Sequence, residues 1–313
     1  MFEQMEDLHR TTGLKMFRPT VACKNALLLA KAKSGAVAEA QGLLDELIAI
    51  SLCNGHNRDL MPARSFFVEV LVAWTKCRDV SPVSAASRAH SILTNMIDLS
   101  TNEGYYNVRP DARLFDKLIL CWSRTRAESA AVQIETLISE MKRLGYSPTL
   151  PTYTNLMLAH LRGSSIEAPY QIQKIFNDLS NRCSRGERDV CPDKYVYTIM
   201  IDAWVRHGDT EKAEQQLRTM IDHWKSGKER AKPDSDVFMK ILKASSVEKC
   251  EQYIGMMKEI GVPVPVEAYT CLLYAMSSVD SVQSLDRHSS LGKVIDDVVD
   301  GVGTGRIRRP NFK

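Results

Sequence analysis

KYVYTIMIDAWVRHGDTEKAEQQLRTMIDHWKSGKERAKPD, residues 194–234, carries the pattern of two short amphipathic helices joined by a turn. Its first half places apolar residues at i, i+3, i+4 and i+7, one stripe of a helix, at Tyr197, Met200, Ile201 and Trp204. After Gly208 a second stripe follows at Ala213, Leu217 and Met220. Neither helix can bury its stripe alone, so the stretch predicts a helical hairpin with a neighbour on each side. Pro233 closes it because proline cannot continue a helix interior.

The same hairpin pattern recurs along the chain. An anchor residue near the start of each first helix is aromatic in six copies, at Phe67, Phe115, Tyr153, Tyr197, Phe238 and Tyr269, and Lys24 takes its place in an earlier copy. Prolines stand five residues before most anchors, at intervals of 38 to 48 residues, at Pro19, Pro62, Pro110, Pro148, Pro192 and Pro233. Small residues, expected where helices approach closely, follow six past the anchor at Ala30, Ala73, Cys121, Ala159, Ala203 and Ala244. These repeats predict an all-α, right-handed superhelical solenoid of stacked helix-turn-helix hairpins.

The 313 residues are therefore expected to form one repeat array rather than two globular domains. Residues 1–20 resemble only the second helix of a partial repeat, as if the chain started mid-repeat. The array is predicted over 21–279. Residues 280–313 lose the pattern, and a partly disordered tail is expected there.

Composition limits the function classes. The chain has 41 Lys and Arg against 38 Asp and Glu, and a net charge of +3 does not by itself imply nucleic acid. No apolar run approaches the ~18 residues of a spanning helix, so no membrane segment is expected. The eight cysteines form no CxxC pair, which favours free thiols in a reducing compartment over a disulfide framework.

Two stretches, TYTNLM at 152–157 and YTIMID at 197–202, carry a resemblance to a known family. Each is followed by a basic residue, a turn, a second helix and a Pro-Asp ending. They resemble pentatricopeptide repeats, and the resemblance extends over roughly residues 1–278. It implies binding of single-stranded RNA in a mitochondrion or plastid, with one base read per repeat by two or three side chains.

Basic residues stand nine past the anchor in five consecutive copies: Lys33, Lys76, Arg124, Arg162 and Arg206. Equivalent positions of a stacked array lie along one edge, so these five basic end residues are predicted to contact the RNA backbone. The alternative is that each only complements the dipole at its helix C-terminus.

The resemblance implies that bases are read by the residue after the anchor and by the last residue of the repeat. The candidates are Asn25, Thr154, Asp193, Thr198, Asp234 and Thr270. The pairs Thr154/Asp193 and Thr198/Asp234 match a combination associated in the family with guanine. Alternatively, the threonines cap their helices. The aspartates, with Asp111, are also good N-cap residues.

Other chemistry finds little support. The recurrent Trp74, Trp122 and Trp204 are expected to pack between helices rather than stack on bases. Neither Cys53-x-x-His56 nor the pair Cys183 and Cys191 forms a zinc motif. We therefore expect no catalytic residue, metal, cofactor or small-molecule substrate. The chain is instead expected to act on RNA sterically. The competing hypothesis is a protein–protein adaptor in an organelle gene-expression complex.

Overall fold

The computed structural model describes residues 4, 10–12, 20–53, 61–163 and 165–278, and all regular structure in these ranges is helical. The chain forms two compact units, Met1–Gly163 and Ser164–Lys313. The predicted all-α class of stacked helical hairpins is confirmed. None of the described helices combines the length and hydropathy needed to cross a membrane. The predictions for 1–20 and 280–313 fall almost wholly outside the described residues.

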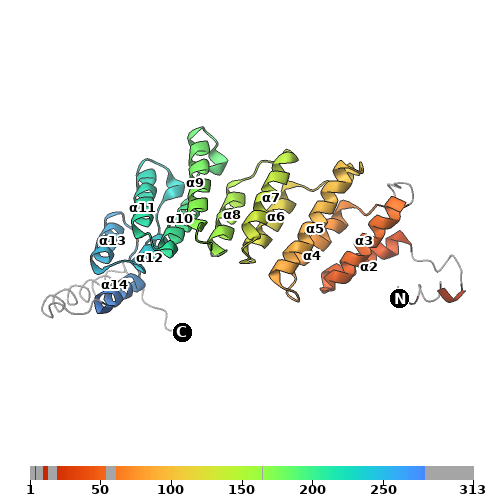
Figure 1. Cartoon of the computed structure of the whole chain (residues 1–313), viewed down its shortest axis with the longest axis horizontal. Helices are drawn as coiled ribbons and strands as arrows, with labels where there is room; N and C mark the ends of the chain where they lie inside the picture. The colour runs from red at the N-terminus through yellow and green to blue at the C-terminus, as the bar shows by residue number, and fades with distance from the viewer. Residues whose placement is uncertain (1–3, 5–9, 13–19, 54–60, 164, 279–313) are drawn as a thin grey trace. The chain divides into compact units, whose positions relative to one another are not determined.

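Between residues 20 and 163, the described part of the first unit contains three hairpins and one further first helix (Figure 1). The hairpins are α2 (Val21–Ser34) with α3 (Val37–Cys53), α4 (Arg64–Lys76) with α5 (Pro82–Thr101), and α6 (Ala112–Ser123) with α7 (Ala130–Arg143), and α8 (Leu150–Arg162) follows. Each first helix also packs against the next one, α2 on α4, α4 on α6 and α6 on α8. The first helices therefore form a continuous layer in this unit.

The second unit repeats this arrangement. Its helices are α9 (Ala168–Ser184), α10 (Lys194–His207), α11 (Thr210–Lys225), α12 (Ser235–Leu242), α13 (Val247–Glu259) and α14 (Val266–Ser278). The first helices α10, α12 and α14 are again neighbours. The exit loops, which lead from a second helix to the next first helix, contain short 3-10 turns: η4 (Arg188–Val190) after α9 and η5 (Glu229–Ala231) after α11.

The anchors form the core. All six aromatic anchors are buried, and so are Trp74, Trp122 and Trp204, which confirms their packing role. The small-residue prediction is confirmed at Ala159 and Ala203, which are buried. It is wrong for the exposed Ala30 and Ala244. Ala244 lies beyond the end of α12 at Leu242, and α2 has no first helix before it among the described residues.

The expectation of free thiols needs one correction. Cys183 and Cys191 form a disulfide, whereas Cys23, Cys53, Cys77, Cys121, Cys250 and Cys271 are free. The last turn of α9 and the η4 turn fold the exit loop back on itself, which brings the two Cα atoms to 4.8 Å. The sequence showed the two cysteines at the ends of one polar loop but not this reversal.

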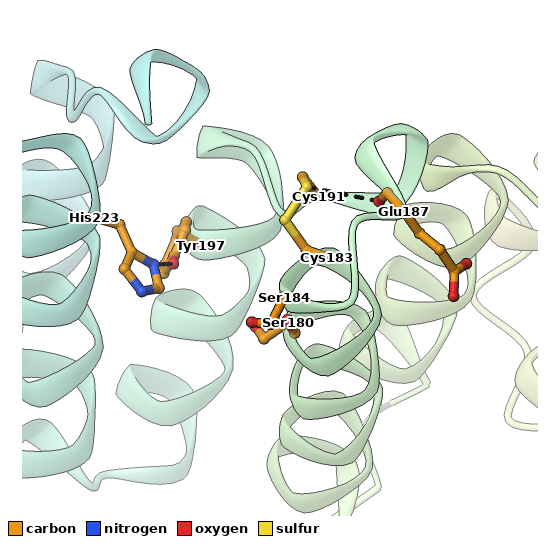
Figure 2. Close-up of a disulfide and its surroundings, with 7 residues drawn as sticks. All are labelled: Ser180, Cys183, Ser184, Glu187, Cys191, Tyr197 and His223. Atoms are coloured by element: carbon orange, nitrogen blue, oxygen red, sulfur yellow. Dashed lines mark hydrogen bonds between the residues drawn. A yellow bond between two sulfur atoms is a disulfide. The ribbon is translucent and has the colours of Figure 1, made fainter. Parts of the chain in front are cut away.

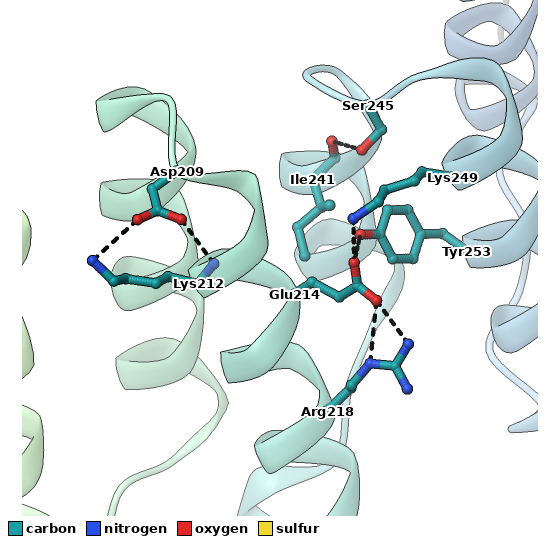
Figure 3. Close-up of polar contacts among 8 residues, drawn as sticks. All are labelled: Asp209, Lys212, Glu214, Arg218, Ile241, Ser245, Lys249 and Tyr253. Atoms are coloured by element: carbon teal, nitrogen blue, oxygen red, sulfur yellow. Dashed lines mark hydrogen bonds and ion pairs between the residues drawn. The ribbon is translucent and has the colours of Figure 1, made fainter.

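Two acidic side chains connect neighbouring hairpins in the second unit. Glu214 of α11 accepts hydrogen bonds from Lys249 Nζ at 2.6 Å and Tyr253 Oη at 3.1 Å, both on α13, and from Arg218 Nη2 at 2.7 Å (Figure 3). In the first-helix layer, Asp202 of α10 pairs with Lys240 of α12 at 3.2 Å. Both carboxylates are largely buried.

Candidate nucleic-acid interface

Lys33 and Lys76 are the two basic end residues that the structure brings closest to a shared surface. They end the neighbouring first helices α2 and α4 and line one hollow of about 470 Å³. Both side chains are exposed, and neither forms an ion pair within 4 Å with a described residue. The acids Glu69 and Asp79 also line the hollow. Its wall therefore offers two ammonium groups that a phosphate could approach.

Arg124 and Arg162 differ in how accessible their guanidinium groups are to a phosphate. Arg124, the C-cap residue of α6, is exposed. Arg162 is half-buried, and its Nη1 donates to the carbonyl of Ser123 at 2.6 Å. This contact joins the ends of α6 and α8. Arg162 therefore has a structural role in which part of its guanidinium is already occupied.

Arg206, the basic end residue of the second unit, is held by its own helix. Its Nε and Nη2 donate to the two oxygens of Asp202 at 3.2 and 3.1 Å. Asp202 lies four residues earlier on α10 and also pairs with Lys240. The Arg206 side chain remains 57% exposed, but the carboxylate offsets part of its charge. A phosphate at this position would meet a weaker field than at Lys33 or Lys76.

The candidate threonines use their hydroxyl protons within their own helices. Thr154 donates to the carbonyl of Leu150 at 2.8 Å, and Thr198 donates to that of Lys194 at 2.7 Å. Thr270, which is exposed, donates to the carbonyl of Glu267 at 2.7 Å. The capping alternative is wrong for these threonines, because they do not accept from early backbone amides. Their oxygens remain acceptors for a donor on a base.

The two candidate aspartates cap the helices that follow them, as the sequence predicts. Asp193 Oδ1 accepts from the amides of Tyr195 at 3.0 Å and Val196 at 3.1 Å. Asp234 Oδ1 accepts from the Val237 amide at 3.3 Å, and its Oδ2 accepts from Lys194 Nζ at 2.8 Å. Both oxygens of Asp234 are thus engaged, whereas Asp193 Oδ2 has no hydrogen-bond partner among the described residues.

An ion pair between the starts of neighbouring first helices recurs in both units. Arg64, at the start of α4, pairs with the N-cap Asp111 of α6 at 2.6 Å. Lys194, at the start of α10, pairs with the N-cap Asp234 of α12 at 2.8 Å. We call these the helix-start ion pairs. Sequence reasoning missed them, although Arg64 and Lys194 both stand three residues before an anchor.

The helix-start ion pairs shift the pKa values of their members. Burial raises the pKa of Asp111, but the hydrogen bonds from Arg64 and from the Leu114 amide outweigh it, so the net shift is downward. The hydrogen bond and charge of Asp234 raise the pKa of Lys194. Each shift favours the charged form of its group, the carboxylate of Asp111 and the ammonium of Lys194.

The Lys194–Asp234 pair borders a cleft of about 1050 Å³ beside the starts of α10, α12 and α14. Tyr195 also lines it, with 62% of its surface exposed and Lys194 Nζ 5.2 Å from its ring centroid. Thr198, one turn further along α10, donates a hydrogen bond to the carbonyl of Lys194.

The remaining candidates are divided between the two units. Asn25 lies on α2 of the first unit, with Oδ1 shielded from solvent and without a partner in the described part of the chain. Thr154 also belongs to the first unit, whereas Asp193 belongs to the second and lines the same cleft as Lys194 and Asp234. Within the described residues, no three His, Cys, Asp or Glu side chains are grouped to hold a metal ion.

Comparison with known proteins adds one finding about α10 and α11. Residues 195–223 match the family model of the pentatricopeptide repeat. The hairpin of α10 and α11 is therefore similar to a pentatricopeptide repeat. The match covers most of the two helices, from Tyr195 to His223, and supports at this hairpin the resemblance inferred from the sequence. No curated protein matches the chain.

Two solved structures are similar to the chain around this pentatricopeptide repeat and beyond it. Both are of the pentatricopeptide repeat protein PPR10 in complex with an 18-nt psaJ RNA element, one of them a triple cysteine-to-serine variant. Each has 16% sequence identity and a TM-score of 0.42 over 88% of this chain. The chain spans 44% of the length of each.

Proposed function

We propose that the chain binds single-stranded RNA along its layer of first helices and acts on it sterically, without catalysis. The pentatricopeptide repeat at residues 195–223 supports this proposal. We also propose a role in RNA processing, stabilisation or translation in a mitochondrion or plastid, which rests on the family resemblance alone.

The observation that carries the proposal is the row of exposed basic end residues in the first unit. Lys33, Lys76 and Arg124 end three successive first helices that pack side by side. None of them forms an ion pair with a described residue. Exposed cations at a repeated structural position suit the repeating charge of a phosphodiester backbone.

Base selection is proposed for the second unit. Thr198 presents an acceptor oxygen, and the helix-start ion pair fixes Asp234 nearby on the next first helix. Asp193 keeps one carboxylate oxygen open, so it is the stronger acceptor for a base N–H. The proposed preference is guanine opposite the Thr198/Asp234 pair.

The test measures RNA affinity against salt for the full chain. The variant Lys33→Ala/Lys76→Ala/Arg124→Ala should weaken binding to a randomised single-stranded RNA pool. The slope of log K against log salt concentration should decrease in magnitude by about 2, because each lost phosphate contact reduces it by about 0.7. Arg206→Ala should change the slope less, because Asp202 already neutralises part of its charge.

A matched control removes three exposed lysines from second helices: Lys142, Lys174 and Lys225. Lys142→Ala/Lys174→Ala/Lys225→Ala should leave affinity and slope near those of the unaltered chain. Equal losses in the two triple variants would mean that only overall charge matters, and the first-helix interface would be rejected. If the chain bound duplex RNA as well as single-stranded RNA, the result would favour the protein-adaptor hypothesis.

A further inference from the structure

A second basic surface lies at the opposite end of α10 from Arg206. The exit loops after α9 and α11 enclose a cleft of about 640 Å³, which we call the loop cleft. Arg188 lines it from the first loop, and Lys228 and Arg230 line it from the second. All three are exposed, and none forms an ion pair with a described residue. One acid, Glu229, also lines the cleft, so its wall is net basic.

The first loop is held in a defined shape. The Cys183–Cys191 disulfide closes the segment that carries Arg188 (Figure 2). Arg182 adds an ion pair to Glu187 at 2.8 Å. Val190, at the end of η4, is 2% exposed and anchors the loop in the hydrophobic core. The Arg188 backbone is therefore positioned before any ligand arrives.

The second loop is anchored in an equivalent way. The Lys228 amide donates to the carbonyl of His223 at 3.0 Å, and the Ala231 amide donates to that of Lys228 at 2.9 Å. Ala231, at the end of η5, is 1% exposed. Lys228 and Arg230 thus project from a short turn fixed at both ends, across from the disulfide-closed loop.

Polar groups line the cleft between the loops. Tyr197 of α10 is hydrogen-bonded to His223 Nδ1 of α11, and Figure 2 shows this pair beside the disulfide. Burial lowers the pKa of His223, and the charge of Lys228 lowers it further. Ser180 Oγ, also on the lining, is shielded from solvent and has no hydrogen-bond partner in the described part of the chain.

We infer that the loop cleft binds a phosphate group. The two arginines and the lysine on its lining provide the charge, and the arginines provide forked N–H donors for phosphate oxygens. The volume lies in the range of small-molecule sites. The cleft is separate from the basic end residues, because Tyr197 and Arg206 lie about 14 Å apart along α10 at ~1.5 Å per residue.

The phosphate could belong to an RNA strand or to a small phosphoester such as a nucleotide. Arg230 lines both the loop cleft and the 1050 Å³ cleft beside Tyr195. A strand that crosses the starts of α10 and α12 would therefore reach Arg230 directly. A free nucleotide would need only the loop cleft itself.

The experiment compares two double variants of the full chain. Arg188→Ala/Lys228→Ala removes one lining cation from each side of the loop cleft. The control, Arg185→Ala/Lys225→Ala, removes two exposed cations that adjoin the same two loops but do not line the cleft. The probes are inorganic phosphate, a nucleoside 5′-monophosphate and a homopolymeric single-stranded RNA, and the readout is the dissociation constant.

The cleft variant should bind at least one of these probes about fivefold or more weakly, while the control changes by less than about twofold. Loss for RNA alone identifies a backbone phosphate, and loss for the smaller probes identifies a small phosphoester. Equal changes in the two variants, or no change in the cleft variant, overturn the inference. Failure of the proposed RNA interface is separable, because Lys33→Ala/Lys76→Ala/Arg124→Ala should leave binding of inorganic phosphate intact.

Discussion

At the scale of single residues, Glu214 makes the stability of the second unit depend on pH. Hydrogen bonds from Lys249 and Arg218 outweigh burial and lower its pKa from 4.5 to about 2. A carboxylate with a depressed folded-state pKa stabilises the fold above its unfolded pKa. This contribution is present above about pH 5 and is lost as pH falls toward about 2.

Glu214→Gln should therefore lower the free energy of unfolding by about 1–3 kcal/mol near neutral pH. This range already allows for solvent screening of the partly exposed Arg218 and Lys249. The difference should shrink as pH falls toward about 2, where Glu214 itself becomes protonated. Urea denaturation followed by circular dichroism at several pH values measures this. The exposed Glu211→Gln on the same helix is the control, and a pH-independent difference for Glu214→Gln would contradict the assignment.

Residue-level predictions from the sequence succeeded where the chemistry was local. Asp193 and Asp234 cap the next helices because a carboxylate just before a helix start accepts hydrogen bonds from the first backbone amides, which have no partner within the helix. The Arg206–Asp202 pair was not predicted, although its i, i+4 spacing is a local signal. The hydrogen bond from Arg162 to the Ser123 carbonyl could not be predicted from the sequence. It joins residues 39 apart, and their approach depends on how α6 and α8 pack.

At the scale of elements, α12 depends on its cap more than longer helices do. It has 8 residues, and Asp234 both caps it and pairs with Lys194. Asp234→Ala should destabilise this helix by about 1–2 kcal/mol, since a lost N-cap costs about 1 kcal/mol and an exposed ion pair adds less. Amide hydrogen exchange should speed up in α12. Asp236→Ala, an exposed residue that makes no cap bond, should leave the exchange rates of these amides unchanged.

The positions of the helices were predictable, and the shapes of the exit loops were not. Apolar stripes, prolines and anchors mark the first helices because burial selects a 3.6-residue period. The loops that build the loop cleft show no such period. Their shape comes from η4, η5 and the Cys183–Cys191 disulfide, all set by tertiary packing.

At the scale of the whole molecule, each hairpin packs mainly against its neighbours. We therefore predict that a core substitution destabilises only the helices near it. Trp204 is 2% exposed and donates to Gln173 Oε1 at 3.2 Å, and Trp122 holds the corresponding place in the first unit at 3% exposed. Trp204→Ala should cost about 3–5 kcal/mol and speed amide exchange in α9 to α12. Trp122→Ala should instead affect α5 to α8. Exchange rising throughout the chain in either variant would show a single cooperative fold.

The helix-start ion pairs have a consequence for how this chain can change over generations. Arg64–Asp111 and Lys194–Asp234 connect the starts of consecutive first helices directly, whereas the exit loops leave that layer and return to it. Codons gained or lost within an exit loop therefore leave the spacing of the helix starts unchanged. Such loops can acquire new sequence, and with it new ligands, while the proposed RNA-facing surface is inherited intact.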